Sequence, residues 1–353
     1  MDFIEKGRRR LPIAHVILAN HAGFCFGVRR AVETAERSAP AMTLGPIIHN
    51  PQVVASLAEI GVHSVEGPDE IPDGSRVVIR SHGIGRAAYQ ALEARHCEIV
   101  DATCPFVQRI HDMAREASQT GTPLIVIGEG DHPEVQGILG WSETPAWAVL
   151  TEDDVMALPP LESARVVAQT TMVQERFDAL CNLLSQRIPR LDVRATICTA
   201  TRDRQQEVAE LARRADVMII IGGRQSSNSR KLYRLAADIC PRTCFIETAA
   251  ELDGIQLKPS DTVGITAGAS TPDCIIKEVV ARMNDIEKKV NPEENQELEV
   301  MSEEAIDKTL VQIRPGHIIT GKVEMITDDE VCVNIGYKSD GIVKKSEIGR
   351  AHV

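Results

Sequence analysis

The chain has 353 residues, more than twice the length of an average domain, so two or more domains with substantial cores are expected. It carries 39 Lys and Arg against 51 Asp and Glu, and the net charge of −12 disfavours a protein that binds phosphate backbones or anionic lipid. Hydrophobic residues make up 43% and aromatic residues only 3%, which indicates an aliphatic core and few rings on which bases can stack.

The sequence contains no signal for a membrane or secretory route. No window reaches the roughly 18 uninterrupted apolar residues that a membrane span requires, and the charged start, Met1 to Arg10, lacks the pattern of a signal peptide. The nine cysteines are odd in number and widely dispersed, which favours reduced thiols over a disulfide framework. We therefore expect a cytoplasmic protein.

After an N-terminal extension over residues 1–12, residues 13–288 alternate short aliphatic runs with longer amphipathic stretches, which is typical of α/β proteins. The predicted strands are Ile13–Ala19, Val77–Ile79, Leu124–Ile127, Arg165–Ala168, Val217–Ile221 and Thr262–Thr266. They are rich in Val and Ile without strict alternation, as in parallel sheets buried on both faces. Gly or small polar residues follow almost every strand, where open α/β sheets form their ligand crevice.

An internal repeat emerges from three cysteines. Cys25, Cys104 and Cys198 each follow a predicted strand and precede an amphipathic helical pattern, at intervals of 79 and 94 residues. This recurrence predicts three similar α/β lobes that each present one thiol to a common centre. The predicted lobes are residues 13–103, 104–196 and 197–288. A cysteine at a helix start has its thiolate favoured by the helix dipole.

Three thiolates from distant segments can bind zinc or an iron–sulfur cluster. Structural zinc sites draw their ligands as close pairs, whereas these cysteines are singletons, so the spacing favours a cluster with one iron left open. The alternative is that some or all are ordinary buried core cysteines. The core is the preferred interpretation for the remaining six cysteines, which are Cys97, Cys181, Cys240, Cys244, Cys274 and Cys332.

A second group of residues offers small hydrogen-bond donors with no lysine at its centre. Its members, which can together hold a phosphate, are His49, His82, Ser226, Ser227, Asn228 and Ser270. The loop around Ser226 lacks the order of a P-loop, which disfavours ATP. Taken singly, each residue is better explained as a helix cap or a core histidine, but all fall on the predicted crevice side.

The third feature is Asp131-His132-Pro133-Glu134, which follows a predicted strand. A carboxyl group in a cleft is a candidate proton donor, because burial raises its pKa toward the working pH. The alternative is a helix start, where Pro in the first turn followed by Glu is favourable. The two interpretations are compatible.

These segments, in this order, resemble the 4-hydroxy-3-methylbut-2-enyl diphosphate reductase family. The motifs that carry the resemblance are Asn20 to Val28, Ile48-His49-Asn50-Pro51, Arg80-Ser81-His82-Gly83, Asp101-Ala102-Thr103-Cys104-Pro105, His132-Pro133-Glu134, Gln169-Thr170-Thr171, Ser226-Ser227-Asn228-Ser229 and Ala267-Gly268-Ala269-Ser270. The resemblance covers about residues 13 to 288.

The resemblance implies a trilobed fold around a 4Fe-4S cluster held by Cys25, Cys104 and Cys198, with the fourth iron left for substrate. It implies that the diphosphate is held by His49, His82, Ser226, Ser227, Asn228 and Ser270. It further implies that His132, Thr170 and Glu134 line the end where the substrate hydroxyl is removed. The implied reaction gives isopentenyl and dimethylallyl diphosphates with electrons from an external carrier such as ferredoxin or flavodoxin.

The character of the sequence changes near its end. Residues 289–313 are expected to form an acidic linker, because Asn291 to Leu310 hold seven acidic residues against one Lys. Residues 314–353 look all-β and resemble the opening half of the OB-fold RNA-binding module repeated in the largest small-subunit ribosomal protein. Because only about half of that module is present, we expect the chain to be a fragment of a longer protein.

Two other functions compete with the reductase. One is a zinc hydrolase acting on a phosphorylated metabolite. The other is an RNA-binding, translation-associated protein, which would depend on residues 314–353. That segment holds six Lys or Arg and six Asp or Glu, so its net charge of zero predicts feeble RNA binding at best.

Overall fold

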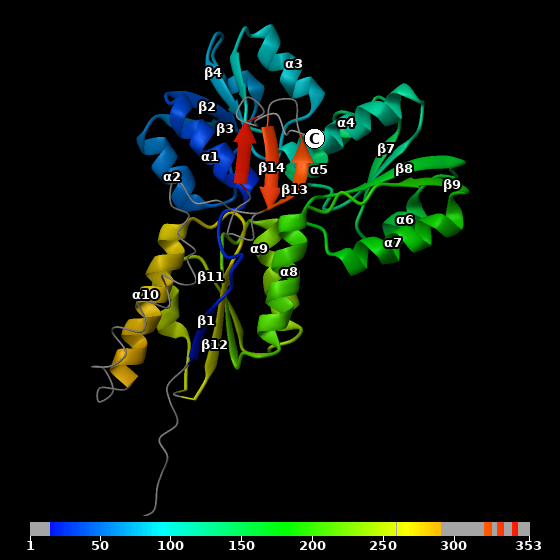
Figure 1. The fold of residues 1–353 in the computed structure, drawn as a ribbon. Helices are drawn as coiled ribbons and strands as arrows, with labels where there is room; N and C mark the ends of the chain where they lie inside the picture. The colour runs from blue at the N-terminus through cyan, green and yellow to red at the C-terminus, as the bar shows by residue number, and fades with distance from the viewer. Residues whose placement is uncertain (1–14, 259, 291–320, 327–329, 335–340, 345–353) are drawn as a thin grey trace, which may run out of the picture.

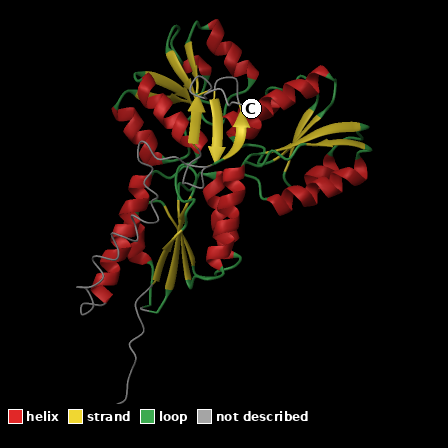
Figure 2. Ribbon diagram, in the orientation of Figure 1, coloured by secondary structure: helices red, strands yellow, loops and turns green. Residues whose placement is uncertain are grey.

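The computed structural model describes residues 15–258, 260–290, 321–326, 330–334 and 341–344. Three lobes surround a common centre, and each contains a four-stranded, all-parallel sheet flanked by helices (Figures 1 and 2). This arrangement confirms the predicted α/β fold of three similar lobes.

The first lobe begins directly after Cys25. Its elements are α1 (Phe26–Ser38), β2 (Ala41–Leu44), α2 (Pro51–Glu59), β3 (Val62–Val65), η1 (Pro68–Glu70), β4 (Arg76–Ile79), α3 (Arg86–Ala94) and β5 (Glu98–Asp101). The strand order in its sheet is β3-β2-β4-β5. The amphipathic pattern predicted after Cys25 is confirmed in α1, because Ala31, Val32 and Ala35 on one face all pack into the core.

The second lobe begins directly after Cys104 and repeats the first. Its elements are α4 (Pro105–Gln119), β6 (Leu124–Ile127), α5 (Pro133–Leu139), β7 (Ala146–Val149), α6 (Glu152–Ala157), β8 (Ser163–Ala168), α7 (Gln174–Arg187) and β9 (Arg190–Val193). The strand order is β7-β6-β8-β9. Strand β6 is buried at all four positions, which explains its continuous run of aliphatic residues.

The third lobe begins directly after Cys198. Its elements are α8 (Thr199–Ala212), β10 (Val217–Ile221), α9 (Ser227–Ala237), β11 (Thr243–Ile246), η2 (Ala249–Gly254), β12 (Thr262–Ala267) and α10 (Asp273–Val290). Its fourth strand is β1 (His15–Leu18), which pairs in parallel with β12, so the order β11-β10-β12-β1 matches the other two sheets.

The position of β1 differs from the prediction that the first lobe starts at residue 13. A strand followed by a cysteine and a helix does recur three times. However, each such strand belongs to a different lobe from the helix that follows its cysteine. Strand β1 therefore completes the third lobe from the other end of the sequence, and Val16, Ile17 and Leu18 pack against that lobe's core. Sequence adjacency alone does not reveal this permuted arrangement.

The C-terminal strands β13 (Lys322–Ile326), β14 (Glu330–Asn334) and β15 (Gly341–Lys344) form an antiparallel sheet in that order. The all-β character predicted for this segment agrees with these three strands. The predicted N-terminal extension, most of the acidic linker and the rest of residues 314–353 lie outside the described residues. Among the helices that are described, none combines the length and apolar character needed to cross a membrane.

We predict that deleting residues 2–18 destabilises the protein, because the β12 edge loses its partner strand and three partly buried apolar side chains are removed. The expected loss is about 3 kcal/mol of unfolding free energy, or roughly 5 °C or more in melting temperature. Truncation after Val290 is the matched control and should shift the melting temperature by less than about 2 °C. An unchanged melting temperature after the first deletion would contradict the assignment of β1 to the third lobe.

Candidate active site

One cavity lies where the three lobes meet, and all twelve residues singled out from the sequence line it. They are Cys25, His49, His82, Cys104, His132, Glu134, Thr170, Cys198, Ser226, Ser227, Asn228 and Ser270. Each lobe contributes a cysteine and polar side chains from the loops after its parallel strands. The predicted crevice position at the carboxyl ends of the strands is therefore correct.

The three cysteines occupy equivalent positions, because each is the N-cap residue of its helix. The backbone N–H of each also donates to a carbonyl in the loop that follows β12, β4 or β8. Cys25 donates to Ala269, Cys104 to Ser81 and Cys198 to Thr170, at 3.3, 3.0 and 3.1 Å. The same hydrogen bond in all three lobes aims one thiol per lobe at the same space.

All three thiols are free rather than paired in disulfides. Burial, followed by the neighbouring thiols, raises the pKa of Cys198 to about 12 and that of Cys104 well above its usual range. A methyl group at Gly27 would overlap the Cys104 sulfur, so glycine is needed where α1 passes this thiol. Three free thiols that line one cavity suit a cationic metal centre that would accept them as thiolates.

The other cysteines whose side chains are described do not line this cavity; they are Cys97, Cys181, Cys240, Cys244 and Cys274. Cys240 is 3% exposed, which agrees with the core position predicted for it. Cys274, also predicted to be in the core, is instead exposed near the start of α10. The apolar pattern around Cys274 belongs to the opposite face of that helix, where Ile275, Ile276 and Val279 are buried.

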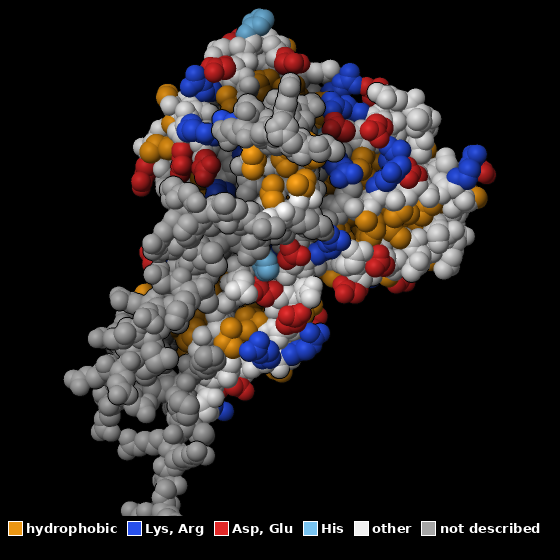
Figure 3. Space-filling model, in the orientation of Figure 1, with side chains coloured by type: hydrophobic (Ala, Val, Ile, Leu, Met, Phe, Trp, Pro, Cys, Tyr) orange, Lys and Arg blue, Asp and Glu red, His pale blue; other side chains and the backbone are white. Residues whose placement is uncertain are grey.

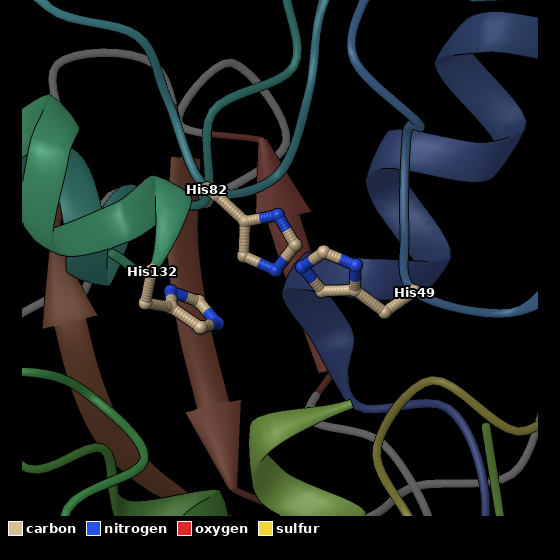
Figure 4. Close-up of side chains that lie close together, drawn as sticks. All are labelled: His49, His82 and His132. Carbon is tan, nitrogen blue, oxygen red and sulfur yellow. The ribbon is translucent and has the colours of Figure 1, made fainter. Parts of the chain in front are cut away.

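Three imidazoles point toward one another across the cavity from three different loops (Figure 4). One ring nitrogen from each of His49, His82 and His132 lies within 4.8 Å of the other two, close enough to share a ligand. His132 is the N-cap of α5, and its Nδ1 accepts the backbone N–H of Glu134 at 3.1 Å. The neutral His132 ring therefore carries its hydrogen on Nε2 and offers a donor, which suits an anionic oxygen better than a metal ion.

Burial lowers the pKa of all three histidines, that of His132 to about 3, so the rings are neutral near pH 7. Several buried polar atoms in this region have no hydrogen-bond partner among the described residues. They are Nε2 of His49, Nδ1 of His82 and both side-chain amide atoms of Asn228. Because buried polar groups are almost always satisfied, these atoms indicate a polar ligand.

The charges around the cavity favour an anionic ligand. Arg80 and Lys231 both lower the pKa of His132, and Arg80 and Arg230 lower that of His49, because each places positive charge nearby. Helices α2, α5 and α9 also begin here, with Asn50, His132 and Ser226 as their N-caps. Exposed N–H groups and the positive ends of these helix dipoles add to the attraction for phosphate.

Glu134 is 2% exposed and lies at the second lobe's side of the cavity. One carboxyl oxygen accepts the backbone N–H of Thr170 at 2.5 Å, and the other lies 2.7 Å from the Thr170 hydroxyl oxygen. Burial raises the pKa of Glu134, and the bonds to Thr170 only partly oppose this. The helix start predicted for this segment is present as well, since α5 begins at Pro133.

The sequence analysis missed a polar network that joins the second and third lobes. Glu129, in the loop after β6, accepts from Ser227 Oγ at 2.6 Å, from Lys231 Nζ at 2.8 Å and from Arg230 at 2.9 Å. Lys231 Nζ also lies 2.9 Å from Ser227 Oγ, so a lysine does sit beside the small donors. The signal available in the sequence was the four-residue spacing of Ser227 and Lys231, which places both side chains on one face of a helix.

Burial alone would raise the pKa of Glu129, but hydrogen bonds from Lys231 and Ser227 together with the nearby positive charge lower it to about 2. Glu129 is thus ionised and paired across the lobe boundary. Arg204 is a charged residue of the cavity lining that the sequence analysis missed. It is 2% exposed, and its Nε has no hydrogen-bond partner among the described residues.

Comparison with known proteins agrees with this geometry. Residues 16–284 match the family model described as LytB protein. A 4-hydroxy-3-methylbut-2-enyl diphosphate reductase of Pelobacter propionicus is 45% identical over 283 residues, covering 78% of this chain and 99% of the relative. The corresponding enzyme of Caldanaerobacter subterraneus subsp. tengcongensis is 40% identical over 279 residues, covering 77% and 97%.

Two solved structures are similar to this chain. One is described as (E)-4-hydroxy-3-methyl-but-2-enyl diphosphate reductase, the terminal enzyme of the non-mevalonate pathway, with a TM-score of 0.58, 40% identity and coverage of 77% of this chain and 100% of that one. The reductase from Plasmodium falciparum has a TM-score of 0.73 at 28% identity, covering 76% and 88%. The family match ends at residue 284 and gives no support to the OB-fold resemblance of residues 314–353.

We predict that Glu129 and Lys231 are energetically coupled across the lobe boundary. A double-mutant cycle with Glu129→Gln and Lys231→Met, followed by urea unfolding at pH 7, should give a coupling energy of about 1 kcal/mol or more. The exposed pair Arg76 and Glu98, which are 3.0 Å apart, is the control and should give less than about 0.5 kcal/mol. Equal coupling energies in the two cycles would show that burial at the lobe boundary adds nothing.

Proposed function

The chain belongs to the LytB protein family, and we propose from that membership that it is the reductase that removes the hydroxyl group of 4-hydroxy-3-methylbut-2-enyl diphosphate. The products would be isopentenyl and dimethylallyl diphosphates, at the last step of the methylerythritol phosphate route to isoprenoids. Curated relatives at 40–45% identity, matched over nearly their whole length, are oxidoreductases of this name.

The single observation that best supports the proposal is the pairing of two chemistries in one cavity. Three free thiols line it together with a set of unsatisfied polar groups that have positive charge nearby. A diphosphate ester fits the second set, and a thiolate-bound metal cluster fits the first. The three histidines are poorly suited to hold a zinc ion, since His132 offers a donor to the cavity.

We propose that Cys25, Cys104 and Cys198 hold a 4Fe-4S cluster. Each lies at a helix N-terminus, where the dipole favours a thiolate, and all three line the cavity as free thiols. When bound, such a cluster supplies electrons and, at an iron without a protein ligand, a Lewis acid. The buried guanidinium of Arg204 at the same cavity is consistent with an anionic group there.

We propose that His49, His82, Ser226, Ser227, Asn228 and Ser270 bind the diphosphate. The hydroxyl of Ser227 donates to Glu129 at 2.6 Å in this structure, and it would turn to a phosphate oxygen when substrate arrives. Glu129 would remain satisfied by Lys231 and Arg230. The hydroxyls of Ser226 and Ser270, 3.2 Å apart, similarly form a preformed pair of donors.

Breaking the carbon–oxygen bond expels hydroxide unless the leaving oxygen is protonated. We propose that Glu134 supplies that proton, because its raised pKa keeps the carboxyl group protonated to higher pH than usual. The Thr170 hydroxyl, 2.7 Å from a carboxyl oxygen of Glu134, can relay the proton. His132 Nε2–H would hold the substrate oxygen, and its tautomer is fixed by the Glu134 backbone N–H.

The electrons would come from an external carrier such as ferredoxin or flavodoxin. On the part of the surface formed by described residues in Figure 3, basic and acidic side chains are interspersed over the three lobes. This face therefore offers no single-sign field for steering a carrier. We propose that the partial OB-fold module of residues 314–353 binds RNA only weakly and takes no part in the reductase reaction.

We predict that anaerobically prepared protein is brown and contains roughly four irons and four sulfides per chain. Cys25→Ser, Cys104→Ser and Cys198→Ser should each impair cluster retention, because each removes one of three protein ligands. Cys240→Ser and Cys244→Ser are the matched controls and should retain the cluster. Iron and sulfide analysis after reconstitution measures the effect. Zinc without sulfide in the wild-type protein would overturn the proposed function.

We predict that Glu134→Gln loads the cluster and binds substrate but turns over roughly 100- to 10,000-fold more slowly. In the wild type, kcat should fall as the pH rises through the raised pKa of Glu134, since the acid form is then lost. The Gln variant should lack this descending limb. His82→Ala is the contrast and should weaken substrate binding more than turnover. Near-normal kcat in a loaded Glu134→Gln protein would move the proton source to His132 or water.

A further inference from the structure

Arg204 is a fully charged side chain in the interior of the protein. It lies on α8, six residues after Cys198, and is 2% exposed, as deeply buried as Glu134. It lines the cavity together with Cys25, Cys104 and Cys198. An arginine stays protonated at any pH that proteins tolerate, so this position carries a permanent positive charge.

The described residues supply Arg204 with hydrogen bonds but no counter-ion. One terminal nitrogen donates to the Ala200 carbonyl and the other to the Gly23 carbonyl, both at 2.9 Å. Glu207, three residues further along α8, is bound instead to His21 and to the backbone N–H of Asn20. A buried cation without an anion is strongly unfavourable, so the pocket is built for an anion that arrives later.

The neighbours of Arg204 identify that anion. Gly23 lies two residues before Cys25, and Ala200 lies two residues after Cys198, so the guanidinium bridges the two segments that bear these thiols. On the proposed function, three thiolates outweigh the charge of the cluster core, which makes the loaded site anionic. Each electron added to the cluster makes it more negative still.

We propose that Arg204 is the counter-ion of the cluster and that its fixed charge raises the cluster's reduction potential. A cation in a water-excluded pocket stabilises the reduced form more than the oxidised form, because the reduced form carries one more negative charge. Arg204 is a positioning residue in this proposal, since it contacts backbone carbonyls rather than substrate. The inference rests on the proposed function, because it requires a cluster at the three cysteines.

The test compares full-length Arg204→Gln and Arg204→Lys proteins, reconstituted anaerobically, with the wild type. Redox titration followed by electron paramagnetic resonance measures the midpoint potential without turnover. Arg204→Gln should lower the equilibrium constant for one-electron reduction at least tenfold, which is about 59 mV. Arg204→Lys keeps the charge but not the planar fork, and it should stay near the wild type. Arg202→Gln, which removes an exposed charge from the same helix, should change nothing.

Three outcomes would overturn the proposal. The first is an unchanged potential in a fully loaded Arg204→Gln protein. The second is an equal shift in the Gln and Lys variants, which would mean that the hydrogen bonds matter and the charge does not. The third arises if the Arg204→Gln protein does not take up the cluster, because the Arg204→Lys protein then decides. An Arg204→Lys protein that takes up the cluster and has a wild-type potential supports the proposal, and one that does not take up the cluster overturns it. A wild-type protein that holds no iron would instead refute the proposed function.

Discussion

The structure depends on the meeting of helix N-termini at one point. Helices α1, α4 and α8 begin with the cysteines, and α2, α5 and α9 begin beside the polar residues of the same cavity. Free N–H groups and aligned dipoles make such a centre electropositive. Such a field would stabilise the negative charge of the proposed thiolates and of the proposed diphosphate. On the proposed function, one electrostatic arrangement therefore serves both groups.

The helix N-termini of the three lobes can meet because each lobe is the same parallel βα unit with its crevice at the same end. Sequence periodicity predicted β1, β4, β6, β8, β10 and β12, which are aliphatic and, apart from the edge strand β1, fully or largely buried. The strands β2, β3, β5, β7, β9 and β11 were not predicted. Each is four residues long, and all but β7 lack the continuous run of apolar residues on which that prediction depends.

The site was predictable where residues repeat and hidden where it depends on contacts between lobes. The cysteines recur before similar helices, and the polar loops recur after similar strands, so both groups could be read from the sequence. Glu129 and Lys231 are 102 positions apart, and only the docking of the second lobe on the third makes them neighbours. Arg204 resembles any helix arginine in sequence, because its burial depends on contact with the Gly23 loop, which is distant in the sequence.

The pairing of β1 with β12 also affects how the protein is made. Residues 15–18 leave the ribosome about 250 positions before their partner strand, residues 262–267. Closing so long a loop is entropically costly and slow. Until it closes, the backbone N–H of Cys25 cannot donate its hydrogen bond to the Ala269 carbonyl. Assembly of the cavity is therefore a late event, completed only when both ends of this region are available, and a nascent chain cannot offer all three thiols in their final geometry.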